Sequence, residues 1–251
     1  MVARSANSTK IGAPKTRGGL HRKVVDHLAM QIIGGEFVTG QSLPVEADLC
    51  EAMGVGRSSV REAMRVLADK GMVEVRPRTG ARVLDRASWR RLDPDLIGWM
   101  LKAGADREFL ADLVEARRIV EPAAAALAAQ RATGADLARI DTALDAMRRA
   151  MPESGNTRDV IAAVEADVAF HKAVLAASGN SVLEEFEIII DAALRAAFRL
   201  STEMSRSFAL TISAHVHVYE AIRMRDAERA QSAMSGLLNM AARDLGLDAD
   251  K

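Results

Sequence analysis

The sequence is poor in aromatic residues and cysteine, and it has no long apolar run. Only 4% of its 251 residues are Phe, Trp or Tyr although 49% are hydrophobic, so its cores must be aliphatic, a mixture that favours helix over strand. The single cysteine, Cys50, excludes an intramolecular disulfide framework and is typical of the reducing cytoplasm. No apolar run reaches the ~18 residues of a membrane span, and the N-terminus lacks the apolar segment of a signal peptide. These absences predict a cytoplasmic, mostly α-helical protein.

An excess of charge of one sign is also missing, but the charges are unevenly distributed. Residues 1–86 hold 14 Lys and Arg against 9 Asp and Glu, whereas residues 87–251 hold 20 against 25. A basic N-terminal part followed by an acidic C-terminal part indicates that only the N-terminal part binds a polyanion. Chance asymmetry in a neutral protein is the alternative that charge alone leaves open. Residues 1–18 have no periodicity and are predicted to form a flexible basic tail.

Two helical patterns meet at a short glycine-containing turn between Leu43 and Leu67. The first starts at Pro44, which suits a first helical turn, and ends at Gly54, a common residue after a helix. The second has apolar residues on one face, and its other face carries Arg57, Ser58, Arg61 and Arg65. This pattern predicts a helix-turn-helix whose second helix is offered to DNA. A solvated helix face with ordinary ion pairs is the alternative for each arginine.

A helix over residues 20–33 is predicted before this motif and a short hairpin after it. Residues 72–75 and 81–84 alternate like strands around Arg76-Pro77-Arg78-Thr79-Gly80, whose glycine suits the turn. A small hairpin with a cationic tip is a wing, suited to the minor groove or the phosphates beside it. Residues 19–86 are therefore predicted to form a winged helix-turn-helix domain, and residues 87–95 a linker.

Residues at fixed offsets mark this N-terminal domain: Leu43-Pro44-x-Glu46, Leu49, Gly54-Val55-x-Arg57-x-x-Val60-Arg61-Glu62-Ala63, Leu67, Gly71 and Arg78-Thr79-Gly80-Ala81-x-Val83. On these residues the domain resembles the winged helix-turn-helix of the GntR family of bacterial transcription regulators. The resemblance implies that Arg57 and Arg61 read base edges in the major groove. It implies that Ser58, Ser59 and Arg65 contact phosphates, and that the wing tip consists of Arg78, Thr79 and Gly80.

Two positions depart from the pattern of that family. Gly56 stands at the N-cap of the recognition helix, where members usually have Ser or Thr. Glycine still caps acceptably, but a hydroxyl that could bond a phosphate is lost. Ala47 stands where some members carry a basic residue. Both departures affect the expected operator sequence and leave DNA binding itself expected.

From residue 96 to residue 246 the periodic segments are all helical and are joined by short loops. The longest, residues 106–131, contains Pro122, where a kink or a break is expected. The other predicted helices cover residues 136–150, 158–178, 181–204, 207–225 and 227–245. They predict an all-α antiparallel bundle. The fold class is therefore mostly α: a winged helix-turn-helix with a small β-hairpin, followed by an all-helical effector-binding and dimerisation domain.

Asp167 and His171 lie one turn apart on a predicted helix and share one face, as two metal ligands would. His215 lies on a later helix that could face them, and a simple surface pair of Asp167 with His171 is the alternative. Together with Ala221-Ile222, six residues after His215, this pattern is similar to the ligand-binding domain of the FadR branch of the family. The resemblance implies a divalent metal, Zn²⁺ or Ni²⁺, held by Asp167, His171 and His215.

The third histidine of that metal signature is replaced by Leu237. Three protein ligands can still hold the metal if water or an effector carboxylate completes the coordination. Alternatively, Asp167, His171 and His215 bind a polyol effector by hydrogen bonds. His217 is not a substitute, because a residue two positions from His215 on a helix points away from it.

Arg117 lies in the segment Glu115-Ala116-Arg117-Arg118-Ile119-Val120-Glu121-Pro122, which looks like the first long helix of that ligand-binding domain. The resemblance implies that Arg117 binds an acidic effector, since its planar fork matches a carboxylate. A structural ion pair with an internal Asp or Glu is the alternative. The run Leu92 to Trp99 and the missing third histidine resemble the regulators of sugar-acid catabolism, which implies an aldonate such as galactonate.

The resulting hypothesis is a homodimeric repressor, bound to double-stranded operator DNA and released by a small organic acid. It is expected in the bacterial cytoplasm, with the nucleoid when bound to DNA and without membrane contact. A metal-dependent hydrolytic enzyme is one alternative. No general base stands at a recognisable spacing from the Asp and His residues, so we expect no enzyme activity. A DNA-binding protein without an effector is the other alternative.

Overall fold

The computed structural model describes residues 18–76, 80–104, 107–150, 157–200 and 204–247. The chain divides into two compact units, residues 1–99 and 100–251. Apart from Gly18, the basic tail expected at residues 1–18 lies outside the described residues. Within these residues, none of the helices combines the length and apolar character that a bilayer crossing demands.

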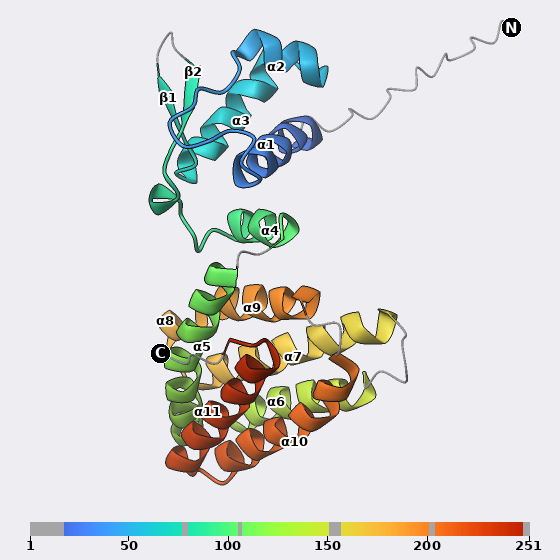
Figure 1. Ribbon diagram of the computed structural model, residues 1–251. Helices are drawn as coiled ribbons and strands as arrows, with labels where there is room; N and C mark the ends of the chain where they lie inside the picture. Colours follow the sequence, from blue (N-terminus) through green and yellow to red (C-terminus); the bar gives the residue numbers. More distant parts are fainter. Residues whose placement is uncertain (1–17, 77–79, 105–106, 151–156, 201–203, 248–251) are drawn as a thin grey trace, which may run out of the picture. The chain divides into compact units, whose positions relative to one another are not determined.

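The first unit is a winged helix-turn-helix, as predicted (Figure 1). Its helices are α1 (Gly18–Ile33), α2 (Glu46–Met53) and α3 (Arg57–Asp69), and its hairpin pairs β1 (Val73–Arg76) with β2 (Gly80–Val83). The strands are antiparallel, with Val73 opposite Val83. Val24 and Leu28 of α1 and Leu67 of α3 are completely buried. The 3.6-residue spacing of these side chains thus places α1 across the back of α3 and leaves the polar face of α3 outward.

Helix α2 starts two residues later than expected, at Glu46 instead of Pro44. The backbone N–H of Leu43 donates to the carbonyl of Ala81 at 2.8 Å, so this segment continues the edge of the hairpin as extended chain. Pairing with β2 therefore overrides the local preference of Pro44 for a first helical turn. The end of α2 follows the prediction, since Gly54 adopts the left-handed conformation with φ of 62°.

The exit from the recognition helix requires glycine. Gly71 has φ of +73°, and a Cβ atom there would clash with the carbonyl oxygen of Ser88. Ser88 ends the short helix η1 (Arg86–Ser88), after which α4 (Pro94–Lys102) begins. The Lys70 ammonium at the end of α3 binds Asp93 at 2.6 Å and Asp95 at 2.8 Å. These contacts fix the segment after the wing to the end of α3.

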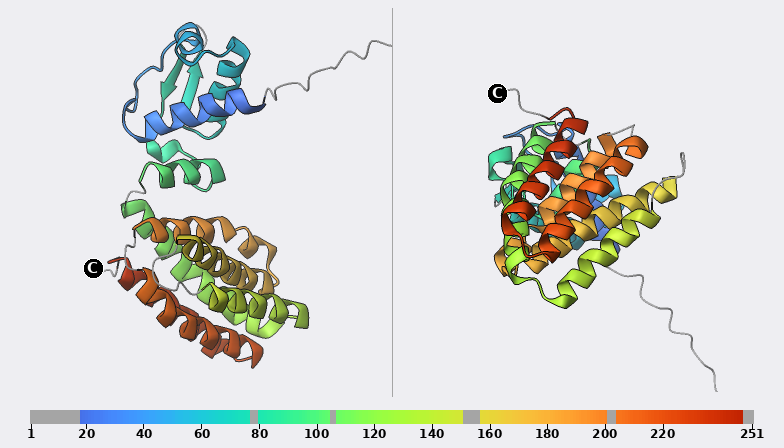
Figure 2. Two further views of the ribbon diagram at one scale, coloured as in Figure 1. Left: turned by 90° about the vertical axis from the view of Figure 1, so that its right-hand side faces the viewer. Right: turned by 90° about the horizontal axis from the view of Figure 1, so that it is seen from below.

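The second unit is an all-helical bundle, as predicted. Its helices pack side by side in Figures 1 and 2. The helix pairs in most extensive contact are α5 with α11, α6 with α7, α10 with α11 and α5 with α7. Their bounds are α5 (Arg107–Arg131), α6 (Gly134–Arg149), α7 (Thr157–Ala177), α8 (Ser181–Glu184), α9 (Glu187–Leu200), α10 (Met204–Arg223) and α11 (Ala227–Asp244). Alanines such as Ala125, Ala128 and Ala129 are completely buried in the core, so the helices approach one another closely.

The helices differ from expectation at two places. Of the kink or break expected at Pro122, the break does not occur: helix α5 continues through the buried Pro122, because packing against its neighbours offsets the hydrogen bond that proline cannot make. The single helix expected over residues 181–204 is divided into α8 and α9. Phe186, between α8 and α9, is partly buried and packs against the core cluster of Ala124, Leu175 and Ile190.

Candidate functional site

The recognition helix presents a polar face at its N-terminal end. Arg57 and Ser58 are exposed and Ser59 is half-buried. Gly56 occupies the N-cap position and supplies no side-chain cap, as expected for a residue without a hydroxyl. No N-cap side chain therefore competes with an anion such as a phosphate at the N-terminus of α3.

Arg61 and Arg65 lie further along the same face and are engaged in exposed ion pairs. Arg61 is 68% exposed, and its Nε donates to both carboxylate oxygens of Glu46 on α2, at 3.0 and 2.9 Å. Arg65 binds Glu62 at 2.8 Å within its own helix. An exposed pair such as that of Arg61 with Glu46 contributes only about 0–1 kcal/mol to stability, so DNA can compete with Glu46 for the Arg61 guanidinium.

Both arginines border a hollow of about 400 Å³ between the recognition helix and the hairpin, and Gly80 lines it as well. The structure thus places Arg61, Arg65 and Gly80 around one concave surface. The other expected wing-tip residues, Arg78 and Thr79, lie outside the described residues. Sequence reasoning assigned no role to Glu46, although its place in the helix-turn-helix motif could have suggested a partner for Arg61.

The second candidate site is a buried chain of polar groups inside the helical bundle. Arg117 comes from α5, Asp167 and His171 from α7, and His215 from α10. Arg117, His171 and His215 are at most 5% exposed, and the Asp167 side chain is 20% exposed. The structure therefore brings together all four residues that the sequence singled out, from three separate helices.

The fifth member, Glu121, was missed by sequence reasoning. It lies one turn after Arg117 on α5 and is 2% exposed. One of its carboxylate oxygens accepts a hydrogen bond from Arg117 Nε at 2.5 Å, and the other accepts from His171 Nδ1. The spacing of Arg117 and Glu121 was a readable signal for an ion pair, but the contact with His171 depends on how α5 packs against α7.

Hydrogen bonding sets the direction of both imidazole rings. Nδ1 of His215 donates to the backbone carbonyl of Thr211 at 2.7 Å, as Nδ1 of His171 donates to Glu121. The two Nε2 atoms consequently point at the same oxygen of Asp167, from 3.3 Å for His171 and 3.0 Å for His215. Rings protonated on both nitrogens donate to this oxygen, whereas in neutral rings protonated on Nδ1 the Nε2 lone pairs face it and can bind a cation together with it.

The electrostatics of the cluster favour ionised carboxylates. Burial alone would raise the pKa of Glu121, but the charges of Arg117 and His171 outweigh burial and lower this pKa to about 2. Burial would likewise raise the pKa of Asp167, but hydrogen bonds from His171 and His215 hold it well below its usual range. Burial would lower the pKa of His171, yet the charge of Glu121 and its bond to Asp167 raise it.

Two of the distances among these three atoms match the spacing of metal ligands. Around a tetrahedral Zn²⁺ with bonds of about 2.0–2.1 Å, ligand atoms lie roughly 3.3 Å apart. The Asp167 oxygen lies 3.3 Å from His171 Nε2 and 3.0 Å from His215 Nε2, and all three atoms lie within 4.8 Å of one another. Each ring also donates its other N–H to a carboxylate or carbonyl, as metal-binding histidines do. The residues therefore fit a divalent cation.

The structure accounts for the two residues that do not join this cluster. Leu237 is 3% exposed and packs in the core of the bundle, so it supplies no ligand at the position of the missing histidine. His217 is exposed and lies on a different face of α10 from His215.

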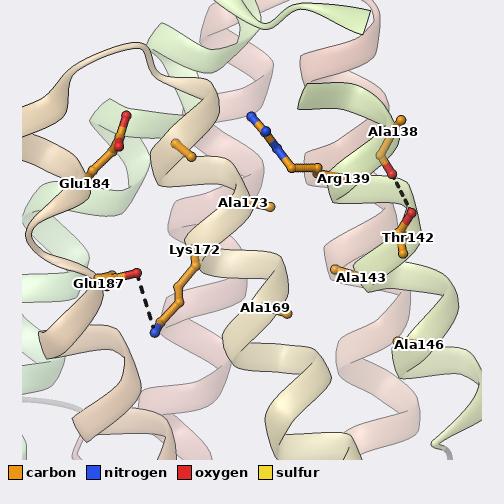
Figure 3. A pocket seen from close by; sticks show the side chains of 11 residues that line it. Ala138, Arg139, Thr142, Ala143, Ala146, Ala169, Lys172, Ala173, Glu184 and Glu187 are labelled. Atoms are coloured by element: carbon orange, nitrogen blue, oxygen red, sulfur yellow. Dashed lines mark hydrogen bonds and ion pairs between the residues drawn. The ribbon is translucent and has the colours of Figure 1, made fainter. Parts of the chain in front are cut away.

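A separate surface groove of about 800 Å³ runs between α6 and α7 (Figure 3). Alanines such as Ala143, Ala169 and Ala173 line it, and Lys172 reaches across to Glu187 at 3.5 Å. The groove lies on a different face of α7 from Asp167 and His171, and its lining includes no member of the buried cluster. It is therefore distinct from the site built around Arg117.

Comparison with known proteins identifies the family of each unit. Residues 20–83 match the family described as bacterial regulatory proteins, gntR family, and residues 112–240 match the FCD domain. The chain is 36% identical to the galactonate operon transcriptional repressor of Escherichia coli over 89% of this chain and 95% of that protein. It is 28% identical to the HTH-type transcriptional repressor NanR of Cronobacter sakazakii over 90% and 85% of the two chains.

The fold is likewise similar to a solved structure. Lar, which controls the expression of the Listeria monocytogenes agr system, superposes with a TM-score of 0.66 at 19% identity, covering 95% of this chain and 100% of that one. At that identity the likeness concerns the fold alone.

Proposed function

The chain belongs to the GntR family of bacterial regulatory proteins, and on that premise we propose that it represses a sugar-acid catabolic operon and is released by the acid. Membership makes it a DNA-binding transcription regulator with an effector-binding domain, and not an enzyme. The observation that carries the proposal is the buried cluster of Arg117, Glu121, Asp167, His171 and His215. The similarity to a galactonate operon repressor supports an aldonate such as galactonate as the effector.

The effector site that we propose has a metal part and an arginine part. Asp167, His171 and His215 hold a divalent cation, Zn²⁺ or Ni²⁺, which supplies a Lewis-acidic point for a carboxylate or hydroxyl group of the effector. Arg117, whose Nη2 lies 3.4 Å from His171 Nε2, is close enough to bind the same anion. A ligand would approach at Asp167, the most exposed member of the set.

The DNA site that we propose consists of the outer face of α3 and the wing. Arg57 and Arg61 read bases, Ser58, Ser59 and Arg65 contact phosphates, and the wing adds Arg78, Thr79 and Gly80. The protein acts as a homodimer in the bacterial cytoplasm, because two recognition helices are needed to read the half-sites of a palindrome about one helical turn apart. Effector binding shifts the population towards dimers in which these helices no longer match the operator.

Thermal unfolding and DNA release test the proposal together. The protein, with and without Zn²⁺ or Ni²⁺, is titrated with D-galactonate and other aldonates, and with galactitol as a control without a carboxylate. At about a hundredfold excess over Kd a ligand adds ~2.7 kcal/mol, a rise in melting temperature of roughly 5–10 °C. The same acid should release the protein from its own promoter DNA. If no sugar acid shifts melting or DNA binding at any metal loading, the proposed effector class is wrong.

A further inference from the structure

Glu121 bridges the two functional parts of the buried cluster. Its carboxylate accepts from Arg117 Nε at 2.5 Å with one oxygen and from His171 Nδ1 with the other. The bond to Arg117 lies within α5, whereas the bond to His171 joins α5 to α7. Glu121 itself is 2% exposed, so both bonds are shielded from water. The Glu121 side chain thus orients the guanidinium of Arg117 on α5 and the imidazole of His171 on α7.

The bond to His171 decides which ring nitrogen carries a lone pair. A carboxylate can only accept, so the Nδ1 atom that faces it must hold the proton. In the neutral ring, Nε2 then presents its lone pair towards Asp167 Oδ1, 3.3 Å away. A histidine protonated only on Nε2 could not ligate a metal through that atom. Orientation of His171 as a ligand therefore depends on an acceptor at the position of Glu121.

Resting on the metal site proposed above, we propose that Glu121 is the positioning residue that commits His171 Nε2 to the metal and the outer edge of Arg117 to the effector. Glu121 occupies the Nε of Arg117 and leaves the two Nη atoms. Nη2 lies 3.4 Å from His171 Nε2 and uses that lone pair as its acceptor. When His171 Nε2 gives its lone pair to a cation, Arg117 Nη2 loses this acceptor, and one of its N–H groups then lies beside the cation. An anion that binds there meets both positive groups, so acid binding follows metal binding.

Glu121→Gln tests the proposal with little change of shape. The amide oxygen can accept from only one of the two donors, and the amide N–H₂ then faces the other donor. The position of the His171 proton is consequently no longer fixed. Calorimetric titration of the full chain with Zn²⁺ alone should show an affinity loss of about 10- to 100-fold, the usual effect of removing an outer partner of a metal-binding histidine. Glu115→Gln, an exposed carboxylate on the same helix, is the matched control and should bind Zn²⁺ like the wild type.

A spectroscopic readout separates positioning from a general structural role. In the Zn²⁺-loaded protein labelled with ¹⁵N-histidine, the His171 ring should carry its proton on Nδ1, and the resonance is assigned with a His171→Gln variant. That N–H signal should shift or disappear in Glu121→Gln while the circular dichroism spectrum stays unchanged. If Glu121→Gln does not fold, the wild-type spectrum still decides: a proton on Nε2, or ligation through Nδ1, overturns the proposal.

The outcomes for the metal site and for Glu121 are distinct. If the wild type binds Zn²⁺ and Glu121→Gln binds it equally tightly, the role of Glu121 is refuted and the metal site stands. If the wild type binds neither Zn²⁺ nor Ni²⁺, the metal site and the positioning role both fall. DNA binding by α3 is independent of either result.

Discussion

Removing Arg117 should destabilise the helical bundle far more than removing any surface arginine. Arg117 is 5% exposed and its partner Glu121 is 2% exposed. The pKa of Glu121 is about 2, so this carboxylate stays charged in the folded protein at neutral pH. Arg117→Met leaves that charge buried with His171 as its remaining partner. Loss of one member of a buried pair costs about 3–5 kcal/mol, and we expect the free energy of unfolding of the bundle to fall by this amount.

A double-mutant cycle shows whether the cost comes from the stranded charge. The double variant Arg117→Met/Glu121→Met removes both charges and should be more stable than Arg117→Met alone, with a coupling energy of at least about 2 kcal/mol. The control is Arg148→Ala, whose pair with Asp145 has side chains 48% and 49% exposed. An exposed pair contributes about 0–1 kcal/mol, so this variant should unfold almost like the wild type.

The two units can be followed separately during urea unfolding. Both tryptophans, Trp89 and Trp99, belong to residues 1–99, so their fluorescence reports the first unit. Hydrogen exchange of α5 peptides reports the bundle. The fluorescence transition should be the same in all variants. If Arg117→Met costs no more than Arg148→Ala, or if the double variant is the least stable of the set, the buried pair does not contribute the expected ~3–5 kcal/mol.

Three further perturbations test other parts of the molecule. Arg61→Ala should weaken operator binding by about 1–3 kcal/mol, roughly 5- to 150-fold, in a shift assay at fixed salt; an unchanged ratio of specific to non-specific binding would contradict its role in base reading. Burial would raise the pKa of Asp95, but hydrogen bonds from Lys70 and Arg22 outweigh burial and lower this pKa. The charged Asp95 therefore stabilises the fold above its ordinary pKa of about 3.9, and this stabilisation is lost as the pH falls through its lowered pKa. The difference in unfolding free energy between wild type and Asp95→Asn should shrink below pH ~4. A difference that does not depend on pH would refute this role. Gly71→Ala should cost at least about 1–3 kcal/mol because of its positive φ and the nearby Ser88 carbonyl, whereas Gly236→Ala, in an open position on α11, should stabilise by roughly 0.5–1 kcal/mol; thermal unfolding that ranks the two variants equally would contradict this.

Sequence reasoning succeeded where a single element determines its own pattern. The helix predicted over residues 20–33 forms, and Val24, Leu28 and Ile32, which repeat at helical spacing, are buried; Gly54 ends α2 in the left-handed conformation, as predicted. It failed at the start of α2, because Pro44 has a local preference that the hydrogen bond between Leu43 and Ala81 overrides. That bond joins segments far apart in the sequence, and no local pattern encodes it.

The buried cluster divides in the same way. The spacing of Asp167 and His171 was sufficient to place both side chains on one face of α7. The approach of His215 to the same carboxylate oxygen, at 3.0 Å, requires α10 to cross α7 at the right height. The second oxygen of Glu121 similarly meets His171 only because α5 packs beside α7. Spacing along one helix is therefore readable, whereas convergence of three helices is a property of their packing.

Each unit of this regulator has an arginine paired with a carboxylate of the same chain. The burial of the pair determines whether a ligand can displace the carboxylate. Glu46 binds Arg61, but the two side chains are 42% and 68% exposed, so the proposed DNA contact of Arg61 would displace Glu46 at a cost of about 0–1 kcal/mol. Glu121 holds Arg117 at 2% exposure, and stripping it from its partner would strand a buried charge at about 3–5 kcal/mol. In the proposed effector site, a carboxylate would therefore not reach Arg117 by displacing Glu121. The proposal instead has the carboxylate bind the Nη atoms that Glu121 leaves, and it predicts that tight binding of an acid requires the neighbouring cation.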